Sequence, residues 1–584
     1  MPSINFQTNE VNFKIVYYGP MLSGKTINIQ HIYTRAQKRT SGTNTQTPDS
    51  SAEIMLPPIE LFTTTRAFHC TLDTFPQENG LRPRFHFHKT VGNIAYHESL
   101  HLVLEDVDGI IFVADSQFER MEANVEMMAC LKMYLRAMGQ DLSEIPMVIQ
   151  YAKRDLPNAT PIDVLEKELN PQGVLSFPSI PIQGVGVFES LEACAQQILT
   201  KYKQGGLYAA EKEAINAYLS LQNNQEQITP EETFALLRVL LGQAPSRGHW
   251  NALCAFLDLW PHNDTLSHAI QYTKQHTSDW PTDIKRLPKQ WLLHYKTPRT
   301  KQCLQLVERI DIKNFTCGEK PCIHREWMAT ESLRDVKVLR LYDETFGDGG
   351  LQAFVDTTIA QKPVELALGE GITGKGAAAL AASPKLRSVR TLDLNRNRIG
   401  LRGLRTLLQS PHLKHLKALH LGRNRLSYKH MSLFTEEIAI EALERLDLDH
   451  NKLSPGAIRA LAKAPMLSTL QELNLSHNPI KKGGCDALAD CEQLAHLKVL
   501  VLDECRLKDD DIASLIRSPY LMNLKRLILS RNQLTLKSIE QIANSPTFSQ
   551  LEELDIHWNN LTKEEVDGIL CASPHLKNAK CFCC

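Results

Sequence analysis

Apolar runs alternate with segments of helical spacing over the N-terminal third of the chain. Four of these runs predict strands: "FKIVYYG", "RFHFHKTVG", "VDGIIFVADS" and "IPMVIQYAKRD". Apolar strands separated by helices are typical of a parallel sheet covered on both faces, with a binding site at the strand ends. The pattern therefore predicts an α/β domain over residues 1–203, in which helices cover both faces of a mostly parallel sheet.

Leucines recur with a fixed period toward the C-terminus. Segments such as "VRTLDLNRNRI" and "LKALHLGRNRL" follow the pattern L-x-x-L-x-L-x-x-[N/C]-x-L, and one leucine recurs every 27 residues, at Leu392, Leu419, Leu446, Leu473, Leu500, Leu527 and Leu554. With two less regular copies before them, about nine repeats occupy residues 331–580. This is the leucine-rich repeat pattern, and its period resembles the ribonuclease-inhibitor type, an α/β solenoid with a helix outside each strand.

Two further columns of residues accompany the leucines. One column is expected to satisfy backbone groups where each strand turns away: Asn397, Asn424, Asn451, Asn478, Cys505, Asn532 and Asn559. The other should face outward on the concave side: Asp393, His420, Asp447, Asn474, Val501, Ile528 and Asp555. Val501 and Ile528, with Val499 beside them, predict exposed aliphatic side chains on a polar surface. Such a patch favours docking of a protein partner, unless a neighbouring domain or a second copy covers it.

Residues 204–330 show helical periodicity and several tryptophans, but no motif that can be assigned. We expect a helical connector that packs against one or both neighbours, and its role cannot be read from the sequence.

Overall charge and hydropathy exclude several classes of protein. A formal net charge of −1 and a pI near 7.1 argue against a basic surface for nucleic acid. The N-terminus lacks the features of a secretory signal, and no apolar stretch approaches the length of a membrane span. A cytoplasmic protein is therefore expected.

Cysteines offer two candidate sites. Cys317, Cys322 and His324 in "CGEKPCIH" have zinc-binding donors, but their spacing is irregular and no second pair follows. The tail 581–584, "CFCC", has Cys581 four residues from the end and would attach to a membrane only if its cysteines were lipidated. A cap of small apolar residues on the solenoid is the expected role of this tail.

The strongest chemical signal is the G-x-x-x-x-G-K-[ST] match from Gly19 to Thr26, between a predicted strand and a predicted helix. In such a loop, backbone N–H groups and the helix N-terminus bind phosphate. Lys25 would reach the terminal phosphates, and the Thr26 hydroxyl would bind Mg²⁺. The predicted nucleotide-binding residues here are Gly19, Met21, Leu22, Ser23, Gly24, Lys25, Thr26 and Ile27.

Several motifs in order resemble the Mgl-type, Ras-like small GTPases of bacterial gliding motility and cell polarity: "KIVYYGPMLSGKTINIQHIY", "VDGIIFVADSQFERMEAN", "IPMVIQYAKRDLPNA" and "GVGVFESLEA". The resemblance covers about residues 11–203. It implies a P-loop GTPase fold that binds GTP or GDP with Mg²⁺. It also implies switch loops that recruit a partner when GTP is bound.

The same resemblance assigns the guanine-reading residues. "AKRD" stands where the family has N-K-x-D, so Asp155 would accept from the guanine N–H groups and Lys153 would pack on the base and sugar. Ala152 replaces the family's Asn, which implies a weaker preference for guanine. Gly184 and Val185 complete the cofactor-binding residues that the resemblance implies.

The catalytic region departs further from the family. The family's T-V-P-G-Q corresponds to "KTVGN", which puts Gly92 at the glycine that senses the γ-phosphate and Asn93 at the water-orienting Gln. Arg66 in "TTTRAFHC" matches the family's arginine that stabilises transition-state charge, and Ala67 stands where a Thr would help to hold Mg²⁺. A solvated loop arginine is the alternative for Arg66.

Two functions of different kinds fit these residues. The first is a GTP-binding switch that hydrolyses GTP slowly and docks a protein through its repeats. The second is an interaction scaffold whose GTPase domain binds nucleotide but hydrolyses almost nothing, as the departures at Ala67, Asn93 and Ala152 suggest. ATP-driven signalling, as in nucleotide-gated repeat receptors, is disfavoured by Asp155.

Overall fold

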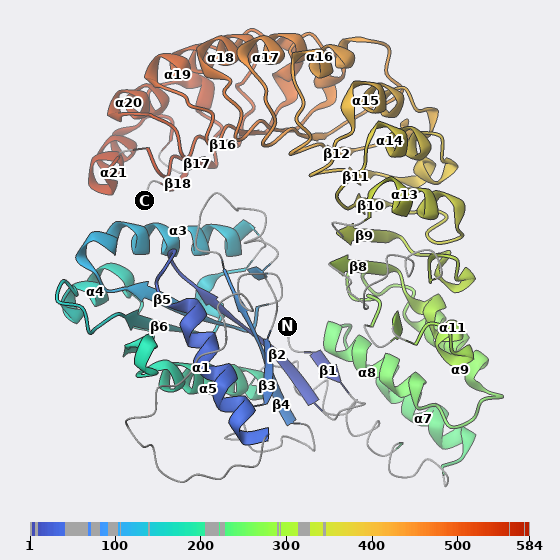
Figure 1. The fold of residues 1–584 in the computed structure, drawn as a ribbon. Coiled ribbons are helices and arrows are strands. Elements are labelled where there is room, and N and C mark those ends of the chain that lie inside the picture. The colour runs from blue at the N-terminus through green and yellow to red at the C-terminus, as the bar shows by residue number, and fades with distance from the viewer. Residues whose placement is uncertain are drawn as a thin grey trace. The chain divides into compact units, whose positions relative to one another are not determined.

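The computed structural model describes residues 3–5, 10–40, 68–71, 82–90, 103–104, 107–137, 140–204, 221, 228–288, 291–292, 294–313, 327–342, 346–559, 561–576 and 579–582. The chain divides into two compact units, Met1–Ser278 and Asp279–Cys584, and each is described by itself (Figure 1).

A seven-stranded sheet forms the centre of the first unit. Its strands follow the order β3 (Phe68–Thr71), β4 (Arg82–Lys89), β2 (Glu10–Tyr18), β5 (Gly109–Asp115), β6 (Met147–Ala152) and β7 (Ser176–Pro178), and β1 (Ser3–Asn5) pairs with β2. The pairs from β4 through β2, β5 and β6 to β7 are parallel, whereas β1 and β3 are antiparallel to their neighbours. Every residue of β5 and β6 is buried, as expected for apolar strands covered on both faces.

Helices cover both faces of this sheet. Figure 1 shows α1 (Lys25–Thr40) and α5 (Val187–Gln204) on one face and α3 (Met121–Ala137) on the other. α4 (Ile162–Leu169) packs against α3. The predicted α/β class of this domain, with a mostly parallel sheet and helices on both faces, is confirmed.

In the part of the predicted connector that belongs to the first unit, the described helices are α7 (Pro230–Leu241), α8 (Arg247–Asp258) and α9 (Leu266–His276). Side-chain caps fix where two of them begin. Thr229 forms a capping box with Glu232, and Ser246 accepts from the backbone N–H of His249. The helices contact one another around Trp250 and Trp260, which are fully buried.

The second unit contains a parallel sheet of eleven strands in strict chain order. These strands are β8 (Arg309–Lys313), β9 (Val338–Tyr342), β10 (Glu365–Leu368), β11 (Thr391–Asp393), β12 (Ala418–His420), β13 (Arg445–Asp447), β14 (Glu472–Asn474), β15 (Val499–Val501), β16 (Arg526–Ile528), β17 (Glu553–Asp555) and β18 (Lys580–Phe582). The first strand lies upstream of residue 331, where the leucine pattern starts. The last strand places Cys581 in the sheet beside β17.

Helices lie outside the strands of this solenoid (Figure 1). After α11 (Pro298–Cys303), they are α13 (Gly347–Asp356), α14 (Gly374–Ala381), α15 (Gly400–Leu408), α16 (Tyr428–Met431), α17 (Pro455–Leu461), α18 (Lys481–Ala489), α19 (Asp509–Ile516), α20 (Leu536–Ala543) and α21 (Lys563–Ala572). Among the described residues, we find no helix with both the length and the apolar character needed to cross a bilayer.

The asparagine column satisfies backbone groups as expected. Nδ2 of Asn451 donates to the carbonyls of Leu421 and Leu448 at 3.0 and 2.9 Å. Its Oδ1 accepts from the backbone N–H groups of Asn424 and Leu426 at 3.0 and 2.9 Å. Each asparagine therefore links its own turn to the preceding repeat, which makes the column part of the solenoid's core.

One expectation for the concave side is wrong. Val499, Val501 and Ile528 are half-buried rather than exposed, because Val501 and Ile528 lie side by side in register on β15 and β16. Asp555, the last residue of that column, is buried, and its carboxylate lies 2.7 Å from Nδ1 of His557. The aliphatic patch is therefore smaller than the sequence predicts.

Candidate functional site

The phosphate loop connects the end of β2 to the first turn of α1, and its backbone requires glycine. Gly19 and Gly24 have φ values of 140° and 108°, and Leu22 between them is also left-handed at 64°. A Cβ on Gly19 would lie 2.3 Å from the carbonyl oxygen of Val113 in β5. Only glycine permits this close approach to β5. Gly19 therefore allows the chain to turn sharply directly after β2.

Lys25 lies folded over this loop. Its Nζ donates to the carbonyls of Gly19 and Pro20 at 2.7 and 2.5 Å and lies 3.5 Å from Oγ of Ser23. The side chain is buried. Burial, followed by the positive charges of Lys89 and Arg120, lowers the pKa of Lys25 to about 7. Among the described residues, no carboxylate forms an ion pair with this ammonium group, which favours binding of an anionic ligand.

A second ammonium group reaches the same loop from β4. Lys89 is the last residue of β4 and is paired in register with Tyr17 of β2. Its Nζ donates to Oγ1 of Thr26 at 3.1 Å. Burial lowers the pKa of Lys89 as well. The hydroxyl that the sequence predicts as a Mg²⁺ ligand therefore accepts a hydrogen bond from a cation.

The predicted base-binding residues follow the end of β6, which is separated from β2 by β5 in the sheet. Lys153 has a left-handed backbone at 64°, and its Nζ lies 2.6 Å from Oδ2 of Asp115 and 3.2 Å from Oε1 of Gln117. Asp155 is exposed, which leaves its carboxylate open to a ligand. The structure therefore places both residues on the same edge of the sheet as the phosphate loop.

Gly184 and Val185 come to the same edge on the loop after β7. Gly184 is left-handed, with φ 77°, and Val185 is half exposed. A Cβ on Gly184 would lie 3.2 Å from Nδ1 of His31 in α1, and one on Gly24 would lie 3.1 Å from Cγ of Pro181. The loop that carries Gly184 therefore packs against the phosphate loop and its helix.

The sequence reasoning missed the residue that joins these loops. Nε2 of Gln150 in β6 lies 3.0 Å from Oδ1 of Asn28 in α1 and 3.1 Å from the carbonyl oxygen of Gly186. Asn28 in turn donates to the carbonyl of Gly24 at 3.1 Å. An amide inside the fully buried strand "MVIQYA" is costly without partners, so its polarity was a usable signal.

Asp115 and Asn124 were also missed. The side chain of Asn124 accepts from the backbone N–H of Asp115 and donates to its carbonyl, both at 2.8 Å. Arg120, between them in sequence, donates to the carbonyl of Met21 in the phosphate loop at 2.9 Å. Together, these contacts fix the end of β5 and tie it to the phosphate loop.

The predicted catalytic residues Arg66 and Asn93, and the γ-phosphate sensor Gly92, lie outside the described residues. The same holds for Cys317, Cys322 and His324, the weak zinc candidate. Of the remaining phosphate-loop residues, Met21 and Leu22 are exposed, whereas Ser23 is buried. Thr26 and Ile27 lie in the first turn of α1.

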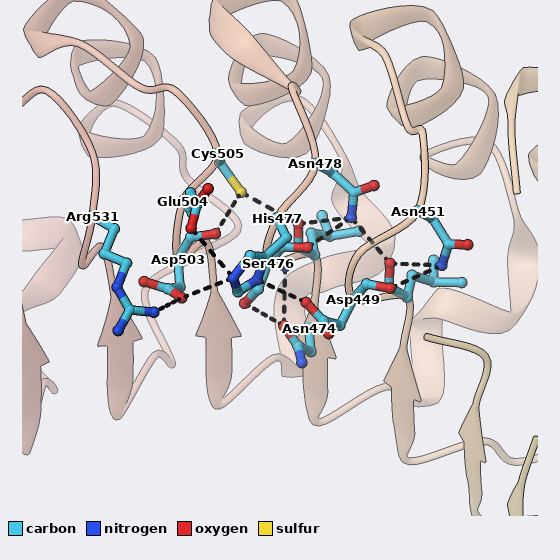
Figure 2. A network of polar contacts seen from close by, with 12 residues as sticks. Asp449, Asn451, Asn474, Ser476, His477, Asn478, Asp503, Glu504, Cys505 and Arg531 are labelled. Carbon is cyan, nitrogen blue, oxygen red and sulfur yellow. Dashed lines mark hydrogen bonds and ion pairs between the residues drawn. The ribbon is translucent and has the colours of Figure 1, made fainter. Parts of the chain in front are cut away.

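A separate polar cluster lies on the loops after β13 to β16 of the solenoid (Figure 2). Nδ1 of His477 lies 2.9 Å from Oδ1 of Asp449, and its Nε2 lies 3.4 Å from Oε2 of Glu504. Arg531 donates to Asp503 at 3.3 Å. The possible ligand atoms of Asp449, His450 and His477 lie within 4.8 Å of one another. Because Asp449 already pairs with His477, we assign this cluster to charge balance between successive repeats.

Comparison with known proteins identifies the N-terminal domain. Over 210 residues, the chain is 41% identical to the Mutual gliding-motility protein MglA of Myxococcus xanthus (strain DK1622), a match that takes in 35% of this chain and 100% of that protein. The chain belongs to the MglA family. The resemblance read from the motifs is thus confirmed, and the loops described above are those of the MglA-type domain.

The solenoid is identified separately. A family model described as "Leucine Rich repeat" matches residues 385–408 and 467–489. Together with the parallel strands and outer helices of the second unit, this match confirms that an MglA-type small GTPase domain and a leucine-rich repeat solenoid occur in one chain.

Proposed function

We propose that the chain is a GTP-binding switch protein. In this proposal the MglA-type domain binds GTP or GDP at its phosphate loop and hydrolyses GTP slowly, and the leucine-rich repeats dock a protein partner. The observation that carries the binding step is Lys25, a buried ammonium group held against the carbonyls of Gly19 and Pro20. Phosphate oxygens would supply an anionic partner, which this group does not have in the part of the chain that the structure describes.

Guanine would be recognised by Lys153 and Asp155, which follow the end of β6. The ammonium group of Lys153 is held by Asp115, and the carboxylate of Asp155, two residues further along the chain, is exposed. A carboxylate there would accept from two N–H groups of guanine. Ala152 supplies no side-chain amide to brace this loop, so we expect a modest preference for guanine over other bases.

The MglA family also implies Mg²⁺, and the residues fit the metal less well than they fit the nucleotide. Mg²⁺, when bound, bridges phosphate oxygens and takes oxygen ligands such as a Thr hydroxyl. Thr26 offers that hydroxyl, but its Oγ1 accepts from the ammonium group of Lys89. The metal fits at Thr26 only if Lys89 leaves this contact, and no step of the proposal depends on it.

Partner docking is proposed for the concave side of the repeats, at Val501, Ile528 and their polar neighbours. Because these two side chains are half-buried, they would offer a partner only a small apolar contact within a larger polar surface.

The alternative function is an interaction scaffold with a degenerate GTPase domain. The contact of the Lys89 ammonium group with Thr26 favours this alternative as much as the departures from the family sequence at Ala67, Asn93 and Ala152 do.

One experiment separates the two functions. The nucleotide that copurifies with the full-length chain is released and identified by anion exchange, and single-turnover hydrolysis of GTP is then followed with and without a captured partner. A switch is expected to release guanine nucleotide and to hydrolyse GTP faster with its partner. A scaffold would release the same nucleotide but show no turnover in either case, and adenine nucleotide would contradict both.

A further inference from the structure

We propose that the ammonium group of Lys89 provides, at the hydroxyl of Thr26, the positive charge that Mg²⁺ commonly provides beside a phosphate loop. Guanine nucleotide would then bind to this chain without the metal. This inference rests on the proposed nucleotide site and adds a specific property to it, namely how affinity responds to removal of Mg²⁺.

The position of Lys89 is set by the sheet. β4 runs parallel to β2, and Lys89 stands opposite Tyr17, two residues before Gly19 opens the phosphate loop. The next residue, Thr90, donates its backbone N–H to the carbonyl of Tyr17 at 3.1 Å, which continues the pairing beyond Lys89. The Lys89 side chain therefore starts at the sheet edge from which the loop rises, and its Nζ reaches Oγ1 of Thr26 at 3.1 Å.

The positive charges around the phosphate loop also favour a polyphosphate ligand there. Lys25, Lys89 and Arg120 all approach it, and burial, followed by the charges of Lys89 and Arg120, lowers the pKa of Lys25. Arg120 has Asp115 at 3.8 Å. Within the part of the chain that the structure describes, no carboxylate forms an ion pair with Lys25 or Lys89. Two partly desolvated ammonium groups in this arrangement repel each other, and a polyphosphate between them would remove that cost.

An ammonium group is a chemically reasonable substitute for the metal here. It is a compact cation whose three N–H donors can be shared between the Thr26 hydroxyl and phosphate oxygens. A divalent ion bound at Thr26 would stand beside Lys89 with like charges close together, which is unfavourable in a partly buried site. Lys89 and Mg²⁺ therefore compete for the same place.

The test is a fluorescence titration of nucleotide-stripped, full-length protein with a fluorescent GDP, in excess Mg²⁺ and in excess EDTA. We expect the wild-type affinity to differ by less than about threefold between the two buffers, whereas Lys89→Thr should lose about tenfold or more in EDTA and recover in Mg²⁺. Lys167→Thr, at an exposed position of α4, serves as the matched control and should behave as wild type.

The possible results of this titration separate failure of the role of Lys89 from failure of the nucleotide site. A wild-type affinity that collapses in EDTA overturns the role of Lys89, whether or not Lys89→Thr folds, because that comparison needs no variant. Equal behaviour of Lys89→Thr and wild type in both buffers also overturns it. Absence of binding by the wild type in both buffers would overturn the proposed nucleotide site itself. Lys25→Ala, which removes a phosphate ligand, should lose binding in both buffers and so marks that separate failure.

Discussion

The ammonium nitrogen of Lys153 lies 2.6 Å from Oδ2 of Asp115, whose carboxylate is buried at the end of β5. This ion pair joins the ends of two adjacent strands, and it holds a lysine whose backbone is left-handed. Arg120 also approaches Asp115, at 3.8 Å, while donating to the phosphate loop. The proposed base-binding and phosphate-binding parts of the site therefore share one buried carboxylate.

Asp115→Asn tests this shared role. The substitution keeps the shape of the side chain but removes the charge that faces Lys153, so Lys153 should be less well placed beside the base. We expect GDP affinity to fall about tenfold, and the MglA-type domain to lose about 2 kcal/mol of unfolding free energy. Titration with GDP and urea unfolding measure the two effects. Asp163→Asn, exposed in α4, is the control, and unchanged affinity in Asp115→Asn would contradict the role assigned to the pair.

The lowered pKa of Lys25 predicts proton uptake on nucleotide binding. In the free protein the pKa of Lys25 is about 7, because of burial and then the charges of Lys89 and Arg120. Phosphate oxygens would raise that pKa toward the ordinary value for lysine. Between these two pKa values the free protein is partly neutral at Lys25 and the complex is charged, so binding takes up a proton and weakens as pH rises.

Isothermal titration calorimetry of GDP binding, in two buffers of different ionisation enthalpy, measures this proton. Near pH 8 we expect an uptake approaching about one proton per nucleotide, which should fall toward zero near pH 6. Lys25→Arg keeps a permanent charge and should show no uptake at either pH, if it still binds. The absence of any uptake at pH 8 would show that Lys25 is already protonated in the free site.

The main features of the fold could be predicted because each rests on local periodicity. Alternating apolar runs gave the strands around the phosphate loop, and a 27-residue step gave the solenoid. The contacts of Gln150, Asp115 and Lys89 could not be predicted in the same way, since each joins residues far apart in sequence. Lys89 follows a strand whose end could be predicted, but only the register with β2 brings it to Thr26.

Packing also explains the wrong expectation on the concave side. The strand pattern alone predicts that each outward position is exposed, whereas in the sheet the side chains of neighbouring strands pack against one another. Val501 and Ile528 are in-register partners on β15 and β16, and side chains in such positions pack against each other. The alternation of a strand predicts which face a side chain is on, and the neighbouring strand decides how much of it remains exposed.

His477 predicts that the solenoid is less stable at alkaline pH. Burial alone would lower the pKa of His477, but its hydrogen bond to Asp449 and the nearby carboxylates of Asp503 and Glu504 raise it above the usual value. A raised histidine pKa stabilises the folded state fully below the unfolded pKa of about 6.5, and this contribution is lost as pH rises through the folded pKa.

Charged and titratable groups around His477 influence how much the unfolding free energy changes with pH. His450 lies with its ring centroid 5.2 Å from that of His477, and Arg531 balances Asp503. We expect urea unfolding of the solenoid to show a loss of about 1 kcal/mol between pH 6 and pH 8, and His477→Gln to reduce that difference. His496→Gln, at an exposed position in the short 3₁₀-helix after α18, is the control. An unchanged pH dependence in His477→Gln would assign the effect to other groups.

Hydrolysis of GTP by the chain alone should be very slow, below the intrinsic rate of about 10⁻⁴ s⁻¹ that unassisted small GTPases reach. Catalysis here depends on holding a water in line with the γ-phosphate and on stabilising charge. Asn93 is one methylene shorter than the Gln it replaces, so Asn93→Gln should raise the single-turnover rate if reach is what limits it. Arg66→Ala should slow any measurable rate only if Arg66 acts within its own chain. A wild-type rate near 1 s⁻¹ without a partner would refute the slow-switch proposal, since the domain would then need no help to turn itself off.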